Sequence, residues 1–279
     1  MAGTRENNML NLLTLWRSAQ ILVIAASLIP NVHAHDFWIR PAPVNGNSGQ
    51  AVAIELLVGQ DLTGDSVPRI EEWFSRFAVI APNGRERRVV GLTGDEPAGS
   101  FTPTVPGVHT VVYRSTAGFS EQTVPKFEAY VREEGIEHLV QPWLQQPKPA
   151  VAREDYYRCA KALVRVDGDS SGYNATVGLE FELTAVTDPF VITARSTTFE
   201  LRFRAKPVIG ALVVARNENQ AKQRVSARTD ALGRVQLEFN QAGHWLVNAV
   251  HLVPAPAGSG LTDWVSYWAS LTFLREATN

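Results

Sequence analysis

The feature that most limits how this chain can fold is a series of short, β-branched segments along most of its length. Ala51–Val58, Val108–Tyr113 and Lys161–Val166 are examples, and turn clusters such as Pro82-Asn83-Gly84 separate segments of this kind. β-Branched and aromatic residues favour strands, whereas Gly, Pro, Asn and Asp favour turns. Short strands at this spacing are typical of antiparallel sandwiches. The sequence therefore predicts an all-β fold.

One stretch breaks this pattern. Phe127–Leu144 contains charged residues together with apolar residues at mixed spacing, which predicts a short helix and a connector. After the first 34 residues, 245 remain, more than one β-sandwich typically uses. We therefore predict two antiparallel β-sandwich domains, at 35–118 and 161–279, joined by a partly helical connector at 119–160.

The predicted second sandwich carries a more specific pattern. Lys206–Val214, Thr229–Val235 and Gly243–Trp245 resemble the transthyretin-like or carboxypeptidase-regulatory-like sandwich. Pro207 can begin a strand without a ladder N–H, and Gly233 suits a hairpin turn. The pattern indicates a fold and carries little information about chemistry.

The beginning of the chain resembles a cleavable export signal. Arg17 precedes the apolar run Ile21–Ile29, and Val32 and Ala34 provide small residues at −3 and −1 of a cleavage site before His35. A membrane anchor needs about 20 apolar residues, and extending the run that far places Arg17 near its middle. We therefore expect the first 34 residues to be a signal peptide, with a periplasmic mature protein that has no stable membrane anchor.

Charge and cysteine content limit the possible partners and covalent links. The chain after residue 34 has 24 basic and 27 acidic side chains, a net charge of −3, which argues against a nucleic-acid partner. Cys159 is the single cysteine, so no intramolecular disulfide can form. We expect Cys159 to be a small buried hydrophobic residue.

Cleavage before His35 would place an imidazole and a free α-amine on one residue. These two nitrogens can close a chelate ring, and an α-amine pKa of about 7.7–8.0 lets a divalent cation displace its proton. Such ligands suit nickel, cobalt, copper and zinc. His251, near a strand end, is the first candidate for a further ligand, and His109 is the second. We expect His138 and His244 to be surface residues.

The same histidine begins an ordered set of motifs. They are His35-Asp36-Phe37-Trp38-Ile39, the Phe127–Ile136 segment, Arg153–Val164, and Leu179-Glu180-Phe181 followed by Asp188-Pro189-Phe190. Together they resemble a bacterial exported family, domain of unknown function 4198, which includes the periplasmic component of nickel and cobalt uptake systems. The resemblance implies periplasmic metal handling. Gln60 stands where family members often have histidine, which weakens the case for a ligand at that position.

Three functions follow as hypotheses. The first is a non-enzymatic periplasmic protein that binds nickel or cobalt (copper being possible) and supplies it to an inner-membrane importer. The second is a copper-dependent histidine-brace monooxygenase, in which His109 or His251 joins His35. The third is a structural or adhesion module without metal. No Ser-His-Asp order, phosphate loop or Cys-His cluster rises above chance, so no catalytic residue is predicted.

Overall fold

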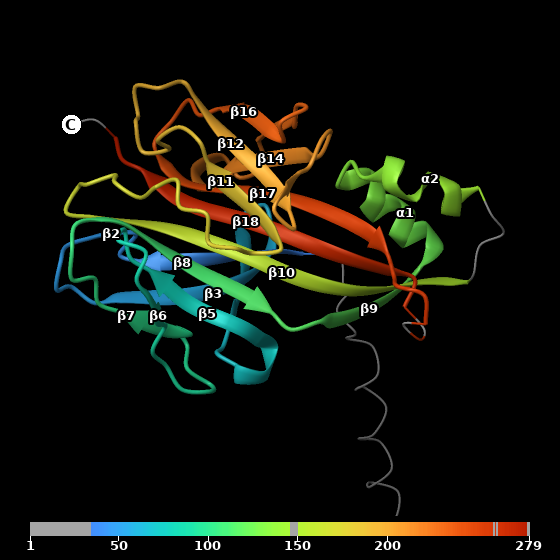
Figure 1. Ribbon diagram of the computed structural model, residues 1–279, viewed down its shortest axis with the longest axis horizontal. Helices are drawn as coiled ribbons and strands as arrows, with labels where there is room; N and C mark the ends of the chain where they lie inside the picture. Colours follow the sequence, from blue (N-terminus) through green and yellow to red (C-terminus); the bar gives the residue numbers. More distant parts are fainter. Residues whose placement is uncertain (1–34, 146–149, 259, 261, 278–279) are drawn as a thin grey trace, which may run out of the picture. The chain divides into compact units, whose positions relative to one another are not determined.

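The computed structural model describes residues 35–145, 150–258, 260 and 262–277. These residues belong to one compact unit built mainly from strands, which confirms the predicted all-β class (Figure 1). The predicted signal peptide lies outside the described residues. Among the residues that are described, no helix is long and apolar enough to cross a bilayer.

The elements follow the chain in this order. The first half contains β1 (Asp36–Ala42), β2 (Asn45–Gly46), β3 (Val52–Gln60), β4 (Thr63–Val67), a 3₁₀ turn (Glu71–Trp73), β5 (Phe74–Ile80), β6 (Glu86–Arg88), β7 (Gly99–Phe101), β8 (Gly107–Ser115), β9 (Gly118–Thr123), α1 (Val124–Glu133) and α2 (Glu137–Leu144). The second half contains β10 (Val151–Val166), β11 (Phe181–Ala185), β12 (Ser196–Phe203), β13 (Lys206–Pro207), β14 (Leu212–Asn217), a 3₁₀ turn (Glu218–Gln220), β15 (Arg224–Arg228), β16 (Arg234–Glu238), β17 (Gly243–Pro254) and β18 (Trp264–Arg275).

A ten-stranded sheet organises the fold. Its main order is β15-β14-β17-β18-β10-β8-β5-β6, and β2 and β9 also pair with β10. β10 runs parallel to β18, with partners from Glu154↔Trp264 to Ala162↔Thr272. Two four-stranded sheets accompany it: β1-β3-β4 with β7 on β3, and β11-β12-β13 with β16 on β12.

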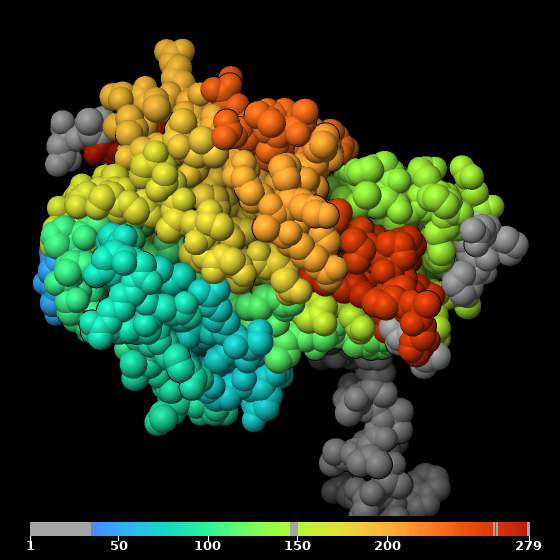
Figure 2. All heavy atoms as spheres, viewed as in Figure 1, coloured from blue at the N-terminus to red at the C-terminus, as the bar shows by residue number. Residues whose placement is uncertain are grey.

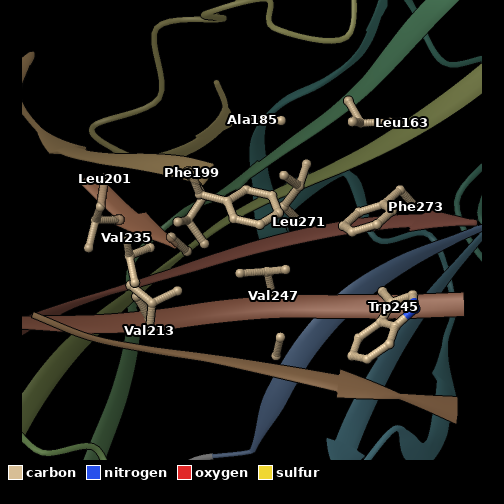
Figure 3. Close-up of a cluster of buried hydrophobic side chains, with 14 of the residues drawn as sticks. Leu163, Ala185, Phe199, Leu201, Val213, Val235, Trp245, Val247, Leu271 and Phe273 are labelled. Carbon is tan, nitrogen blue, oxygen red and sulfur yellow. The ribbon is translucent and has the colours of Figure 1, made fainter. Parts of the chain in front are cut away.

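The central sheet buries both of its faces. Successive strand residues point to opposite faces. On β10, Cys159 and Leu163 therefore enter a core shared with β11, β12 and β16, part of which Figure 3 shows around Leu163, Phe199 and Phe273. Their neighbours Ala160 and Val164 enter a second core, shared with β1 and β3. Cys159 is buried, as predicted.

This arrangement differs from the predicted domain division. The predicted helical stretch is present as α1 and α2, but the 119–160 segment also contains β9 and most of β10. β10 pairs with β8 from the predicted first sandwich and with β18 from the second. The two sandwiches therefore share one continuous sheet, because a strand with two buried faces can serve two cores. Whether they unfold separately stays a prediction.

The two helices cover one end of the central sheet. Phe127 and Val131 of α1 pack with Val250 and Leu252 of β17 and with Trp264 of β18. Figure 2 shows the helices, in green, beside the β17–β18 hairpin, in red. The end of α1 lies near the beginning of β1, because Glu134 interacts electrostatically with Asp36.

Candidate functional site at the start of β1

His251, the first predicted partner of His35, lies among aromatic rings. Its ring centroid is 4.6 Å from that of Phe203 and 5.7 Å from that of Phe181. Burial, together with the charges of His138 and Arg204, lowers the pKa of His251 to about 4. The imidazole is therefore neutral at physiological pH, but it faces the core formed with β11 and β12.

His109, the second predicted partner, is buried on β8. Its Nε2 atom lies 3.0 Å from the carbonyl oxygen of Val105, and its ring is 5.9 Å from that of Phe101. Burial lowers its pKa. Since Phe101 belongs to the core formed with β1 and β3, His109 and His251 face opposite sides of the central sheet. Among the described residues, no three His, Cys, Asp or Glu side chains form a ready-made metal site.

His35 immediately precedes β1, and the next residue begins a network of buried charge. One carboxyl oxygen of Asp36 accepts a 2.6 Å hydrogen bond from the side-chain amide of Asn248. Nη1 of Arg216 lies 3.9 Å from the other oxygen. Burial outweighs both contacts and raises the pKa of Asp36 to about 6. Asn248 and Arg216 come from β17 and β14, so three distant segments meet here.

Asp61 shares the same arginine. Nε of Arg216 donates to Oδ1 of Asp61 at 3.2 Å, across 155 positions of the chain. Asp61 and Leu62 form the tight turn between β3 and β4, and both have left-handed backbone angles, with φ of 51° and 56°. This turn returns the chain beside β1, where Asp61 competes with Asp36 for the one guanidinium.

Glu134, the residue after α1, brings a further carboxyl group. Burial is the main cause that raises its pKa to about 8, and the charges of Asp36 and Glu133 add to the effect. Arg216 and the charge of Arg224 oppose it without cancelling it. We call Asp36, Asp61, Glu133 and Glu134 the carboxyl cluster. Within this cluster, burial favours the protonated forms of Asp36 and Glu134, and a nearby cation would favour their ionised forms.

Sequence reasoning did not identify the carboxyl cluster as a site. Asp36 lies within the His35–Ile39 motif and Glu134 within the Phe127–Ile136 segment, but no local pattern marks either residue as part of a site. Both lie in segments that resemble the family, and this was the available signal. Arg216 had no signal in its local sequence, because its partner Asp61 is brought close only by the sheet.

The raised pKa values predict a dependence of stability on pH. A carboxyl group that keeps its proton in the folded state, and loses it in the unfolded state, makes stability fall as pH rises. For Glu134 this window runs from its ordinary value of 4.5 to about 8. We expect Glu134→Gln to become progressively more stable than the native protein between pH 5 and pH 8, since glutamine cannot ionise. Urea unfolding across this range measures the difference.

Glu137→Gln, at the beginning of α2, is the matched control and should show no such trend. A constant difference between Glu134→Gln and the native protein over this range would show that Glu134 ionises freely in the folded state.

The fold and the site define an all-β protein with layered sandwiches and a charged network beside its first strand. The chain belongs to the family described as Domain of unknown function (DUF4198), whose profile matches residues 32–253. No curated protein matches the chain.

One of the solved structures that match this chain comes from an adhesion protein. It is the crystal structure of a tetra-tandem repeat in the extending region of a large adhesion protein, at 12% sequence identity and a TM-score of 0.21. The alignment covers 86% of this chain and 49% of the adhesion chain. The protein thus spans about half the length of that chain, and the low TM-score carries no argument about fold or function.

Proposed function

We propose that this protein is exported to the periplasm and binds a divalent transition-metal ion there, nickel or cobalt in the first place. The ion would bind to the α-amine and imidazole of His35 after removal of the first 34 residues, and would pass to an inner-membrane importer. Copper is the alternative ion, because amine and imidazole ligands bind it strongly.

The observation that supports this proposal is the carboxyl cluster, which begins with Asp36, the residue after His35. Burial is the largest cause of the raised pKa values of Asp36 and Glu134, and the charge of Arg216 offsets it only in part. A divalent cation held by the adjacent His35 would supply positive charge and favour the ionised carboxylates. The resemblance of the His35–Ile39 motif to a family with nickel and cobalt uptake components favours these two metals.

The test compares proteins that differ only at the amino terminus. Intact-mass analysis first establishes that the exported chain begins with His35. We then expect nickel or cobalt to bind this form at least tenfold more tightly than a form with one added residue, which removes the amine from the chelate. His35→Ala should weaken binding by a similar factor, and calorimetric titration measures each affinity.

Proton release adds an independent readout. We expect a metal bound at His35 to displace the proton of Glu134 near pH 7, because Glu134 interacts electrostatically with the neighbouring Asp36. Titrations in buffers of different ionisation enthalpy should therefore show fewer protons released by Glu134→Gln. His138→Ala, which changes an exposed imidazole, is the matched control. His251→Ala should also leave the affinity unchanged, because His251 faces the other core. Equal affinity of the extended and the native amino terminus would place any metal elsewhere.

The two other hypotheses are outcomes of the same titration. A copper histidine-brace monooxygenase requires a second imidazole, so selective copper binding that depends on His109 or His251 would favour it. A structural or adhesion module requires no metal, so the absence of binding by nickel, cobalt and copper would favour that function.

A further inference from the structure

A separate cavity lies on the other face of β1. It has a volume of about 300 Å³ and is lined by residues of β1, β3, β4, β8 and β10, together with the 3₁₀ turn before β5 and the turn from β8 to β9. Phe37 lines it, whereas the preceding residue Asp36 contacts Asn248. Because adjacent strand residues face opposite ways, the cavity is distinct from the carboxyl cluster.

Arg158 provides the charge of this cavity. Its guanidinium carbon lies 4.8 Å from the centroid of the Phe37 ring and 5.5 Å from that of Tyr156. Within the described part of the chain, no carboxylate pairs with this guanidinium and no oxygen accepts a hydrogen bond from it. The backbone N–H of Arg158 donates a hydrogen bond to Oγ of Ser115 at 2.8 Å. This bond holds the backbone of β10 and does not involve the guanidinium.

The other basic side chains of β10 are paired. Arg153 contacts Glu121, Lys161 contacts Glu182, and Arg165 contacts Glu276. Arg158 alone among these four described side chains has no carboxylate partner, its guanidinium lies over the rings of Phe37 and Tyr156, and burial lowers its pKa. A desolvated cation without an anion is costly, and an incoming anion would offset that cost.

Aromatic rings form part of the cavity wall. Tyr113 packs against Phe37 with ring centroids 4.8 Å apart and donates a hydrogen bond to the carbonyl oxygen of Trp73 at 3.3 Å. Burial raises the pKa of Tyr113 to about 12, so it cannot supply a negative charge to Arg158. Trp73 also lines the cavity and is 53% exposed, which leaves an indole face accessible to a ligand.

We propose that this cavity binds a small molecule with a carboxylate on a flat apolar body of one or two rings. The single guanidinium fork matches one carboxylate, and the described residues that line the cavity include no second cation to favour a multiply charged phosphate. The aromatic walls suit stacking of a planar body. The volume is at the lower end of the range for small-molecule sites, which limits the ligand to this size.

The probe is 2-naphthoate, titrated by calorimetry and by tryptophan fluorescence in the presence of EDTA, so that metals play no part. We expect saturable binding that is weakened tenfold or more in Arg158→Met, which keeps an apolar stem but removes the fork. The neutral analogue 2-naphthamide should bind the native protein more weakly than 2-naphthoate does, and should bind both proteins about equally.

Further variants separate the contributions. Trp73→Ala should weaken the binding of both ligands. Arg153→Met, on the same strand as Arg158, and His35→Ala, in the proposed metal site, should leave the affinity for 2-naphthoate unchanged. If Arg158→Met does not fold, the affinity of Arg158→Lys for 2-naphthoate and the difference in affinity between 2-naphthoate and 2-naphthamide still test the proposal. The proposal is overturned if 2-naphthoate fails to bind at millimolar concentration, if it binds the native protein no more tightly than the amide, or if a folded Arg158 variant binds it unchanged.

Discussion

Replacing Lys161 with methionine should lower the free energy of unfolding by about 3–5 kcal/mol, because it leaves a buried carboxylate without its cation. Nζ of Lys161 lies 2.9 Å from Oε1 of Glu182, and the two side chains are 2% and 4% exposed. Glu182 also accepts backbone N–H bonds from Val177 at 2.7 Å and Gly178 at 3.0 Å. The pair therefore fixes the loop before β11 to the central sheet. Urea unfolding at pH 7 measures the loss.

Arg153→Met is the matched control on the same strand. The Arg153–Glu121 pair is 2.8 Å long, but its side chains are 29% and 46% exposed. Exposed pairs contribute about 0–1 kcal/mol, so this variant should remain close to the native protein. Equal losses for the two variants would mean that the Lys161–Glu182 pair contributes no more than a surface pair.

Trp38→Ala should cost a similar amount, about 3–5 kcal/mol, because it empties the space of a large buried side chain. Trp38 is 1% exposed and packs with Leu57 and Leu246 between β1 and β17. A Cβ atom added at Gly64 would lie 2.8 Å from the indole, which shows how closely the β3–β4 hairpin approaches it. Thermal and urea unfolding measure the change.

Trp38→Phe keeps most of the packing and should cost clearly less. The indole nitrogen has no hydrogen-bond partner among the described residues, so its loss leaves no new unpaired group. Trp38 lies on the same face of β1 as Asp36, and Trp38→Ala should therefore also loosen the attachment of β1 to β17 beside His35. A loss for Trp38→Phe equal to that for Trp38→Ala would contradict the packing explanation.

The strands that could be predicted are those with a local signal. Ala51–Val58 and Val108–Tyr113 carry β-branched residues and end near turns, and both are strands in the structure. The first ten residues of β10 fall in the predicted connector, because Arg153, Glu154 and Arg158 interrupt any apolar strand pattern there. Their charges are instead accommodated by Glu121, by Ser266 and by the aromatic cavity.

Of the residues in the candidate site, only His35 could be predicted from the sequence. His35 followed from a cleavage pattern, which is local, and the prediction of a metal there remains a hypothesis. The meeting of Asp36, Glu134 and Arg216 depends on pairing between strands and on the docking of α1, and no periodicity in the chain encodes such contacts. His109 and His251 have plausible local positions, but strand geometry directs them to opposite faces.

The parallel pairing of β10 with β18 has a consequence for the order of events in folding. The strands that join there come from positions about 110 residues apart, as the Arg153–Asp263 hydrogen bond illustrates. Until β18 arrives, β10 and β17 each have an unpaired edge, and such edges are prone to pair with other chains. Contacts so distant in sequence form slowly. A chain crossing a membrane before this step would depend on a holdase or on rapid completion of the sheet to avoid aggregation.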